Sequence, residues 1–263
     1  MKKAVMVGTS WKMNKTLAEA LAWCEEVSEA LPQLSHPQIQ PFVIPPFTLI
    51  HPVSDFFRQH GIPILSGGQN MHQSPAGAWT GEISASMLRD AGASLVELGH
   101  SERRQAFNES DAAINEKVHS ALSHGLRPLV CVGDSAAEKT WGVSVESVLR
   151  QVSIALYQVS ADQAAQVIFA YEPIWAIGEK GTPASPDQVA ILHGALRNML
   201  CTRYGEQVGK VMTLLYGGSV STDNCEALFS QPDVDGLFIG RAAWRADGYC
   251  EIVRRIRRML LAD

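Results

Sequence analysis

The feature that most constrains the fold is a regular alternation of two kinds of segment. Eight short apolar or β-branched runs recur along the chain, and most are separated by longer segments whose apolar residues repeat at a helical period. The short runs predict strands and the longer segments predict helices. Strands joined through helices run parallel with right-handed crossovers, so the alternation predicts an α/β fold. The predicted strands are 4–9, 39–44, 62–66, 94–99, 127–133, 166–172, 210–218 and 234–240.

The clearest helical periods lie at 17–31, 112–125, 145–159 and 186–200. Thr16, Ser144 and Ser185 directly precede three of these segments and are residue types that cap helix N-termini. The chain closes with a further amphipathic segment, in which the arginine run 254–258 alternates with apolar residues. We expect that run to be the solvated face of a last helix.

Eight βα units within 263 residues fit a closed (β/α)8 barrel, the TIM barrel. An open doubly wound sheet is the alternative, but its G-x-G-x-x-G fingerprint is missing from the first turn. No linker, low-complexity segment or charge block divides the chain. The sequence therefore predicts a single barrel domain over residues 1–263.

Composition argues against several functional classes. The formal net charge of −5 disfavours general nucleic-acid binding. No apolar run approaches the length of a membrane span, and the run after the first lysines is too short for a signal peptide. Five cysteines without a C-x-x-C pair suit a reducing cytoplasm better than a disulfide framework or a zinc site.

Polar residues fall at the predicted carboxyl ends of the strands, where barrels of this kind build their active sites. Together they predict one small-molecule site. They are Ser10, Lys12, Gln69, Asn70, His100, Glu102, Cys131, Glu172, Ser219, Gly240 and Arg241.

Each residue type suggests a chemistry and leaves an alternative open. Glu172 could be a general base whose pKa is raised by an apolar cover, or a structural or solvated carboxylate. His100 precedes a predicted helix, whose dipole would keep it neutral, or it is a hydrogen-bonded core histidine. Lys12 suggests an anion contact, or a surface lysine with a buried stem. His100 and Glu102 are two residues apart, which is not the spacing of a helical metal pair, so no metal site is expected.

Glycine-containing turns follow the last two predicted strands. The segment 216–220 reads YGGSV, and Gly240 begins another turn. Such turns bring backbone N–H groups close to an anion, and together they form the common phosphate site of barrels, although a Gly-Gly pair is often only a turn. G-E-K-G at 178–181 lacks the spacing of a P-loop.

Several motifs, taken in order, resemble the signature segments of the triosephosphate isomerase family over essentially the whole chain. They are SWKMN (10–14), QNMH (69–72), GAWTGE (77–82), ELGHSERR (97–104), CVGD (131–134), AYEPIWAIG (170–178), YGGSV (216–220) and DGLFIG (235–240).

The resemblance implies a role for each site residue and no cofactor. Glu172 would be the base that moves a proton between adjacent carbons, His100 the neutral electrophile and Lys12 the cation beside the enediolate and phosphate. Glu102 would be a supporting carboxylate. Phosphate contacts would come from Gly178, Ser219, Gly240 and Arg241, largely through backbone N–H groups.

The resemblance also implies a lid and a homodimer. Residues 173–185 would close over the substrate and exclude water, which protects an enediol phosphate from elimination. The loop around Thr80 would reach into the partner subunit's active site. The expected partners are therefore a phosphorylated sugar and a second copy of the chain, with neither a membrane nor a nucleic acid.

Three departures from the commonest family pattern bear on the substrate. Ser10 stands where asparagine is usual, which leaves room near the substrate oxygens. The lid is one residue longer and carries Pro183, and Arg241 replaces the second glycine after the last strand. These features resemble a branch in bacterial erythritol or tetritol catabolism that interconverts L-erythrulose 1-phosphate and D-erythrulose 4-phosphate. A triosephosphate isomerase of glycolysis and a non-catalytic sugar-phosphate-binding barrel are the alternatives.

Overall fold

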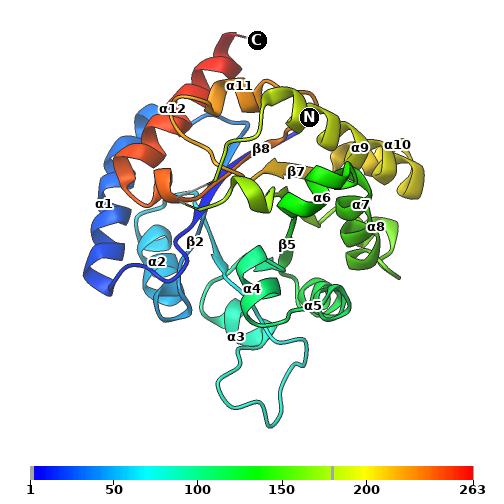
Figure 1. The fold of residues 1–263 in the computed structure, drawn as a ribbon. Helices are drawn as coiled ribbons and strands as arrows, with labels where there is room; N and C mark the ends of the chain where they lie inside the picture. Colours follow the sequence, from blue (N-terminus) through cyan, green and yellow to red (C-terminus); the bar gives the residue numbers. More distant parts are fainter. Residues whose placement is uncertain (1–2, 179–180, 263) are drawn as a thin grey trace.

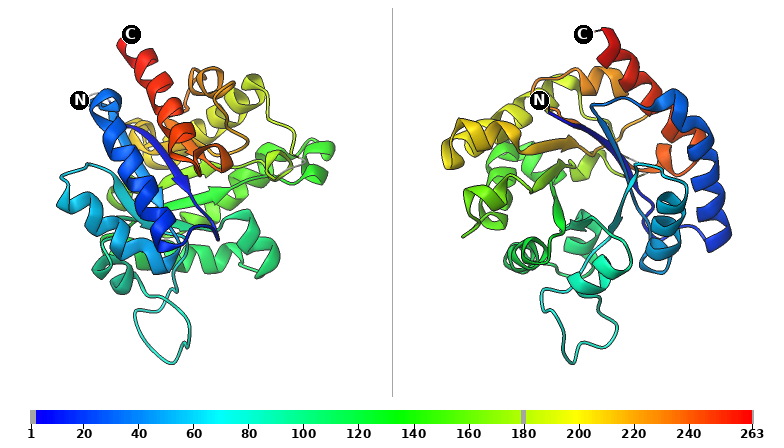
Figure 2. Two further views of the ribbon diagram at one scale, coloured as in Figure 1. Left: turned by 90° about the vertical axis from the view of Figure 1, so that its left-hand side faces the viewer. Right: turned by 180° about the vertical axis from the view of Figure 1, so that it is seen from behind.

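The computed structural model describes residues 3–178 and 181–262. Its strands form a closed parallel barrel in chain order, β1 to β8, and the helices surround the strands (Figures 1 and 2). The predicted α/β barrel is therefore confirmed. The strands are β1 (Val5–Ser10), β2 (Ile39–Ile44), β3 (Leu65–Gly68), β4 (Leu95–Leu98), β5 (Arg127–Val132), β6 (Ile168–Tyr171), β7 (Thr213–Tyr216) and β8 (Gly236–Ile239).

Two strands were predicted to begin three residues earlier than they do. The predicted strand 62–66 begins only at Leu65, because residues 62–64 form a tight turn after helix α2 (Phe47–Gln59). The N–H of Ile62 donates to the carbonyl of Phe57, and the N–H of Ile64 donates to the carbonyl of Ile62. The predicted strand 210–218 begins only at Thr213, because residues 210 and 211 belong to helix α10 (Glu206–Val211).

The helices alternate with the strands, and several connections carry two or three of them. They are α1 (Leu17–Leu34), α2 (Phe47–Gln59), α3 (Ala85–Asp90), α4 (Ser101–Ala106), α5 (Asp111–Ser123), α6 (Ala136–Trp141), α7 (Ser144–Ala155), α8 (Ala161–Ala164), α9 (Pro186–Tyr204), α10 (Glu206–Val211), α11 (Cys225–Phe229) and α12 (Ala246–Ala262), with 3-10 turns η1 (Ile174–Ala176) and η2 (Arg241–Ala243).

Two of the three predicted caps are confirmed. The backbone N–H of Thr16 bonds the Glu19 carboxylate over 2.7 Å at the start of α1, and Ser185 accepts a hydrogen bond from the N–H of Gln188 in α9. Ser144 is instead the first residue of α7, and its hydroxyl donates to Asp134.

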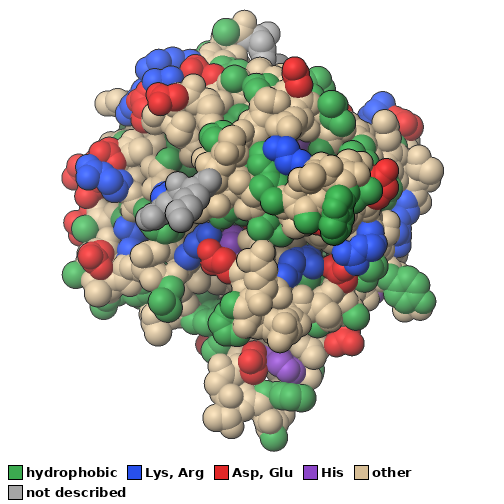
Figure 3. All heavy atoms as spheres, viewed as in Figure 1, with side chains coloured by type: hydrophobic (Ala, Val, Ile, Leu, Met, Phe, Trp, Pro, Cys, Tyr) green, Lys and Arg blue, Asp and Glu red, His purple; other side chains and the backbone are tan. Residues whose placement is uncertain are grey.

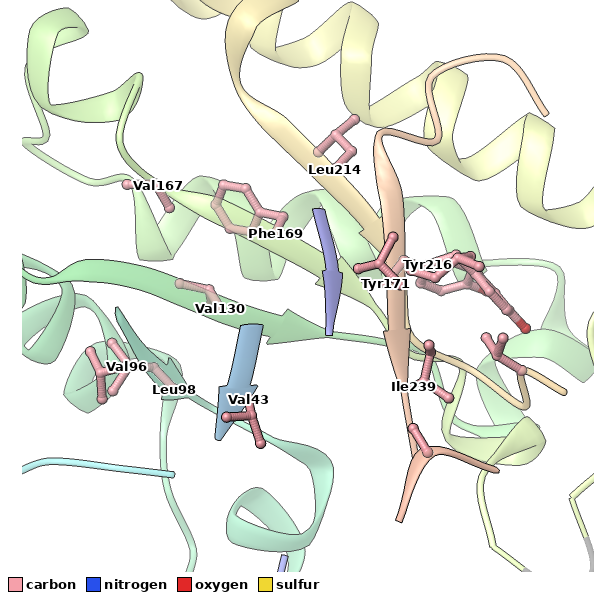
Figure 4. Close-up of a cluster of buried hydrophobic side chains, with 14 of the residues drawn as sticks. Val43, Val96, Leu98, Val130, Val167, Phe169, Tyr171, Leu214, Tyr216 and Ile239 are labelled. Carbon is pink, nitrogen blue, oxygen red and sulfur yellow. The ribbon is translucent and has the colours of Figure 1, made fainter. Parts of the chain in front are cut away.

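Alternation along the strands produces two apolar clusters. One faces the barrel interior and includes Met6, Leu95, Leu129, Ile168 and Phe238. The other lies between the strands and the helices, and Figure 4 shows part of it, including Val96, Leu98, Phe169, Tyr171 and Leu214. Because side chains alternate with period two, a residue's neighbours reveal which face of the strand it occupies.

The connection from β3 to α3 is a long loop that extends away from the barrel (Figures 1 and 2). Thr80 lies in it and is exposed. Within the described residues, no helix is both long enough and apolar enough to span a membrane.

Candidate active site

Four polar side chains point into the carboxyl end of the barrel. On β4, Val96 and Leu98 belong to the outer cluster, so Glu97 between them faces inward beside Leu95. The same alternation applies to β1, β5 and β6. Every second residue of these strands faces the barrel interior, and the last inward-facing residues are Ser10, Cys131 and, directly after β6, Glu172. These residues form a polar layer above the apolar filling of the barrel. All four are buried: Ser10, Glu97, Cys131 and Glu172.

A cavity of about 510 Å³ opens above this layer, within the size range of small-molecule sites. Figure 3 shows this end of the barrel, where basic, acidic and histidine side chains gather near the centre of the view. Nine of the predicted site residues line the cavity, namely Ser10, Lys12, His100, Glu102, Glu172, Gly178, Ser219, Gly240 and Arg241. Gln69, Asn70, Cys131 and Thr80 are not among the described lining residues, and Thr80 lies in the exposed loop after β3.

His100 is held as a neutral imidazole with one nitrogen free for substrate. It is the N-cap of α4, and its Nδ1 accepts the backbone N–H of Glu102 over 3.1 Å. With Nδ1 as the acceptor, a neutral ring carries its proton on Nε2. Burial, and next the charge of Lys12, lower the pKa of His100 to about 4. The ring can therefore donate a hydrogen bond to a substrate oxygen near neutral pH.

Glu172 faces that imidazole. Its Oε2 lies 3.5 Å from Nε2 of His100, and no hydrogen-bond partner for this buried oxygen exists among the described residues. Burial, and next the charge of Glu97, raise the pKa of Glu172 to about 8. A buried, unpartnered carboxylate with a raised pKa is suited to take a proton from carbon.

Gly217 leaves room for the Glu172 side chain. A Cβ at this position would lie 2.7 Å from Cγ and 2.9 Å from Oε1 of Glu172. Glycine after β7 thus permits the carboxylate to occupy its position, independently of any role in holding an anion.

Lys12 brings a positive charge to the cavity on a strained backbone. Its φ of 52° lies in the left-handed region, which is uncommon for a lysine and is found at functional sites. Gln69 fixes this conformation, because its Nε2 donates to the carbonyl of Lys12 over 2.8 Å and to that of Ile44 over 3.2 Å. The ammonium pairs with Oε1 of Glu102 at 2.6 Å. Partial burial would raise the pKa of Glu102, but the hydrogen bond from Lys12 holds it below its ordinary value.

The segments after β6, β7 and β8 line the other part of the cavity. They contribute Gly178, Ser219 and Gly240, together with Arg241, whose Nη2 donates to the carbonyl of Gly178 over 2.8 Å. Glu179 and Lys180 of the expected lid lie outside the described residues.

Asp134 holds the start of the segment after β6. Its carboxylate accepts hydrogen bonds from the Tyr171 hydroxyl at 3.0 Å, the Trp175 indole at 3.0 Å and Ser144 at 2.6 Å. Tyr171 and Trp175 flank Glu172 in the sequence, so these bonds position the backbone that carries the carboxylate.

The sequence reading missed Glu97. This carboxylate is 3% exposed and lines the same cavity. Burial raises the pKa of Glu97 to about 7, although the hydrogen bond from Ser10 opposes the shift. The available signal was a single acidic residue at an inward position of the otherwise apolar strand 94–99.

A parallel βα barrel whose cavity sets a buried carboxylate against a neutral imidazole, with a cation nearby, belongs to the class of enzymes that move protons on a small substrate. Among the described residues, no group of three or more His, Cys, Asp or Glu could hold a metal ion.

Comparisons with known proteins identify the family. The family model described as triosephosphate isomerase matches residues 5–256, so the chain belongs to the triosephosphate isomerase family. The crystal structure of triosephosphate isomerase from Bartonella henselae superimposes with a TM-score of 0.84 at 34% identity, covering 98% of this chain and all of that one.

Curated relatives narrow the similarity further. The chain is 47% identical to an L-erythrulose-1-phosphate isomerase of Mesorhizobium japonicum, over 97% of this chain and 98% of the relative. Proteins of the same name from Rhizobium rhizogenes and Brucella abortus are each 45% identical, over 98% of this chain and 96% and 98% of theirs.

Proposed function

We propose that this protein interconverts L-erythrulose 1-phosphate and D-erythrulose 4-phosphate through an enediolate intermediate. The 3.5 Å approach of Glu172 to the neutral His100 carries the proposal for the chemistry. Relatives named L-erythrulose-1-phosphate isomerase, at 44–47% identity over nearly the whole chain, support the substrate.

The reaction moves a carbonyl by one carbon. In L-erythrulose 1-phosphate the carbonyl is C2, and C3 carries a hydrogen, a hydroxyl and the terminal hydroxymethyl. Glu172 takes the C3 proton while Nε2–H of His100 hydrogen-bonds O2, and the C2–C3 enediolate forms. His100 then shuttles a proton between the two oxygens, and Glu172 returns its proton to C2. The carbonyl now lies at the old C3, which is C2 of D-erythrulose 4-phosphate.

Two parts of the site stabilise the negative charges of the enediolate and the phosphate. The Lys12 ammonium stabilises the enediolate and the phosphate, and Glu102 holds that ammonium in place. We assign the phosphate to the turns at Gly178, Ser219, Gly240 and Arg241, whose segments line one part of the cavity.

Triosephosphate isomerase activity is the second candidate, because the family match and the Bartonella henselae structure both carry that name. Assays of both substrate pairs at matched concentration separate the two. We expect kcat/KM to favour the tetrulose phosphates. A preference for D-glyceraldehyde 3-phosphate by orders of magnitude would refute the assignment.

A non-catalytic sugar-phosphate-binding barrel is tested by Glu172→Gln. For an isomerase, loss of the base lowers kcat by about 1,000-fold or more and leaves phosphate-ligand binding largely intact. Glu206→Gln is the matched control, since Glu206 is 69% exposed and pairs only with Lys210 among the described residues. Unchanged turnover in Glu172→Gln would remove Glu172 from the mechanism.

A homodimer and a cytoplasmic location complete the proposal. The exposed loop 73–82 with Thr80 extends from the barrel (Figure 1), and Trp79 in it is 52% exposed, which supports a partner contact. All five cysteines are free, which supports a reducing compartment. Thr80→Arg should shift the mass measured by light scattering from dimer to monomer and lower kcat.

A further inference from the structure

A second buried carboxylate reaches across the cavity floor from the strand opposite the expected phosphate turns. Glu97 Oε2 accepts a hydrogen bond from the Ser10 hydroxyl at 2.8 Å, and the Cys131 thiol donates to Oε1 over 3.8 Å. Both Glu97 and Ser10 line the cavity. Any ligand that fills the cavity floor must therefore meet this carboxyl and hydroxyl.

Glu97 is not explained as a structural ion pair. Its hydrogen-bond partners among the described residues are a hydroxyl and a thiol, and it takes part in none of their salt bridges. Burying a carboxyl with only neutral partners costs stability. The negative charge of Glu97 also raises the pKa of the neighbouring Glu172. Such an arrangement on an otherwise apolar strand marks a functional group rather than a stabilising one.

The proposed substrate has one polar group for which the mechanism names no partner. A tetrulose phosphate is a triose phosphate with one hydroxymethyl added at the reacting carbon farther from the phosphate. That group begins where Glu172 acts and extends away from the phosphate. His100, Lys12 and Glu172 are already engaged with the carbonyl, the enediolate and the proton on carbon.

The barrel order places Glu97 where this group would go. The expected phosphate contacts follow β6, β7 and β8, whereas Glu97 lies on β4, four strands from β8 in the closed ring. Cys131 lies on β5, between β4 with Glu97 and β6 with Glu172 at its end, and its thiol donates to Glu97. A substrate with its phosphate at Gly240 and its reacting carbons at Glu172 thus ends beside Glu97.

We propose that Glu97, together with Ser10, binds the terminal hydroxymethyl of the four-carbon substrate and is the residue pair that selects tetrulose phosphates over triose phosphates. This inference rests on the proposed function. The ionised carboxylate accepts a hydrogen bond from the substrate hydroxymethyl, and the protonated carboxyl can also donate one; the Ser10 hydroxyl can do both. A triose phosphate leaves these buried groups without their ligand, which disfavours it.

The test compares two replacements of Glu97 on two substrates. Glu97→Leu keeps the approximate volume and removes all hydrogen bonding, whereas Glu97→Gln keeps the shape and a donor and acceptor. The measured quantities are kcat/KM for D-erythrulose 4-phosphate and for D-glyceraldehyde 3-phosphate, and the affinity for 2-phosphoglycolate. The last compound carries a phosphate and a planar carboxylate but no hydroxymethyl, so it reports an intact site.

Glu97→Leu should lower kcat/KM for the tetrulose phosphate by about 100-fold and change the triose phosphate value by about 3-fold or less. Affinity for 2-phosphoglycolate should be retained, and Glu97→Gln should fall between wild type and Glu97→Leu. Both substrates depend on the same Glu172, so an altered pKa of that base cancels in the ratio.

Equal losses on both substrates, or no loss on either, would overturn the inference. If Glu97→Leu fails to fold, the ratio of kcat/KM for the tetrulose phosphate to that for D-glyceraldehyde 3-phosphate is measured in Ser10→Ala and Glu97→Gln instead. A wild-type preference for D-glyceraldehyde 3-phosphate would refute the proposed function by itself. A tetrulose preference that survives Glu97→Leu unchanged would refute only the assignment of Glu97.

Discussion

Arg241, in the turn after β8, donates a hydrogen bond from Nη2 to the carbonyl oxygen of Gly178, 2.8 Å away, in the segment after β6. The bond joins two of the segments to which we assign the phosphate. It also gives a structural meaning to an arginine that departs from the commonest family pattern. Arg241 is exposed, so the bond's contribution is modest.

Arg241→Ala should raise KM by about 3- to 10-fold with a smaller change in kcat, because an ordinary hydrogen bond contributes about 1 kcal/mol. Steady-state kinetics on the preferred substrate measures both constants. Arg245→Ala is the matched control, since Arg245 is a surface arginine paired with Asp247. An unchanged KM in Arg241→Ala would show that the contact with Gly178 does not support binding.

The two buried carboxylates predict a shift in the pH profile. Burial, and next the charge of Glu97, raise the pKa of Glu172 to about 8. The acidic limb of kcat/KM reports ionisation of the free enzyme's base. Glu97→Gln removes the neighbouring negative charge, so this limb should move to lower pH by about one unit.

The shift is measured from kcat/KM of wild type and Glu97→Gln across the same buffers. Glu206→Gln, a change at an exposed carboxylate, should leave the limb where it is. A limb that stays in place in Glu97→Gln would mean that Glu97 carries no charge over the range in which Glu172 titrates.

Stability should respond to pH with a definite sign. Burial raises the pKa of Glu172 well above the ordinary 4.5, so the folded protein binds this proton more tightly than the unfolded chain does. The resulting stability is complete below the ordinary pKa and is lost as pH rises through the folded value. Glu172→Gln should therefore be more stable than wild type near pH 8.5, by on the order of 2 kcal/mol.

Urea unfolding at fixed protein concentration measures this difference at each pH. Near pH 5 the wild-type carboxyl is protonated and resembles glutamine, so the two proteins should there be nearly equal. A constant difference at all pH values would trace the effect to packing rather than to ionisation.

Much of the fold could be read from the sequence because its signals are local. Alternation of strand-like and helix-like segments predicted the barrel, and Thr16 and Ser185 marked two helix starts. Errors arose where tertiary contacts decide. Ser144 was predicted to be a cap, but its hydroxyl donates a hydrogen bond to Asp134, ten residues away. The third predicted strand is apolar from Ile62 onward, but a turn hydrogen-bonded to the end of α2 occupies the residues before Leu65, where the strand begins.

The site was predictable to the extent that its residues follow strand ends. Glu172 and His100 were chosen on that ground, and they face each other at 3.5 Å. Glu97 was missed because it lies within a strand rather than after one. Only the two-residue alternation of side chains along that strand shows that Glu97 faces the cavity. The left-handed backbone of Lys12 could not be foreseen, since the Gln69 side chain that holds it comes from 57 residues away.

Space beside the base is the last testable feature. Gly217→Ala would place a methyl group 2.7 Å from Cγ of Glu172, closer than carbon atoms approach, and the nearest atoms belong to the group that must be positioned. A displaced base is costly, because a misplacement of about 1 Å lowers rates about 100-fold. Gly217→Ala should therefore lower kcat by that factor and change affinity for 2-phosphoglycolate much less.

Gly194→Ala is the control. Gly194 lies within α9, and an added Cβ there would meet no neighbouring atom within 4 Å outside the helix's own backbone. This change should leave kcat unchanged while slightly stabilising the helix. A full-rate Gly217→Ala would show that Glu172 has a second productive position in the cavity.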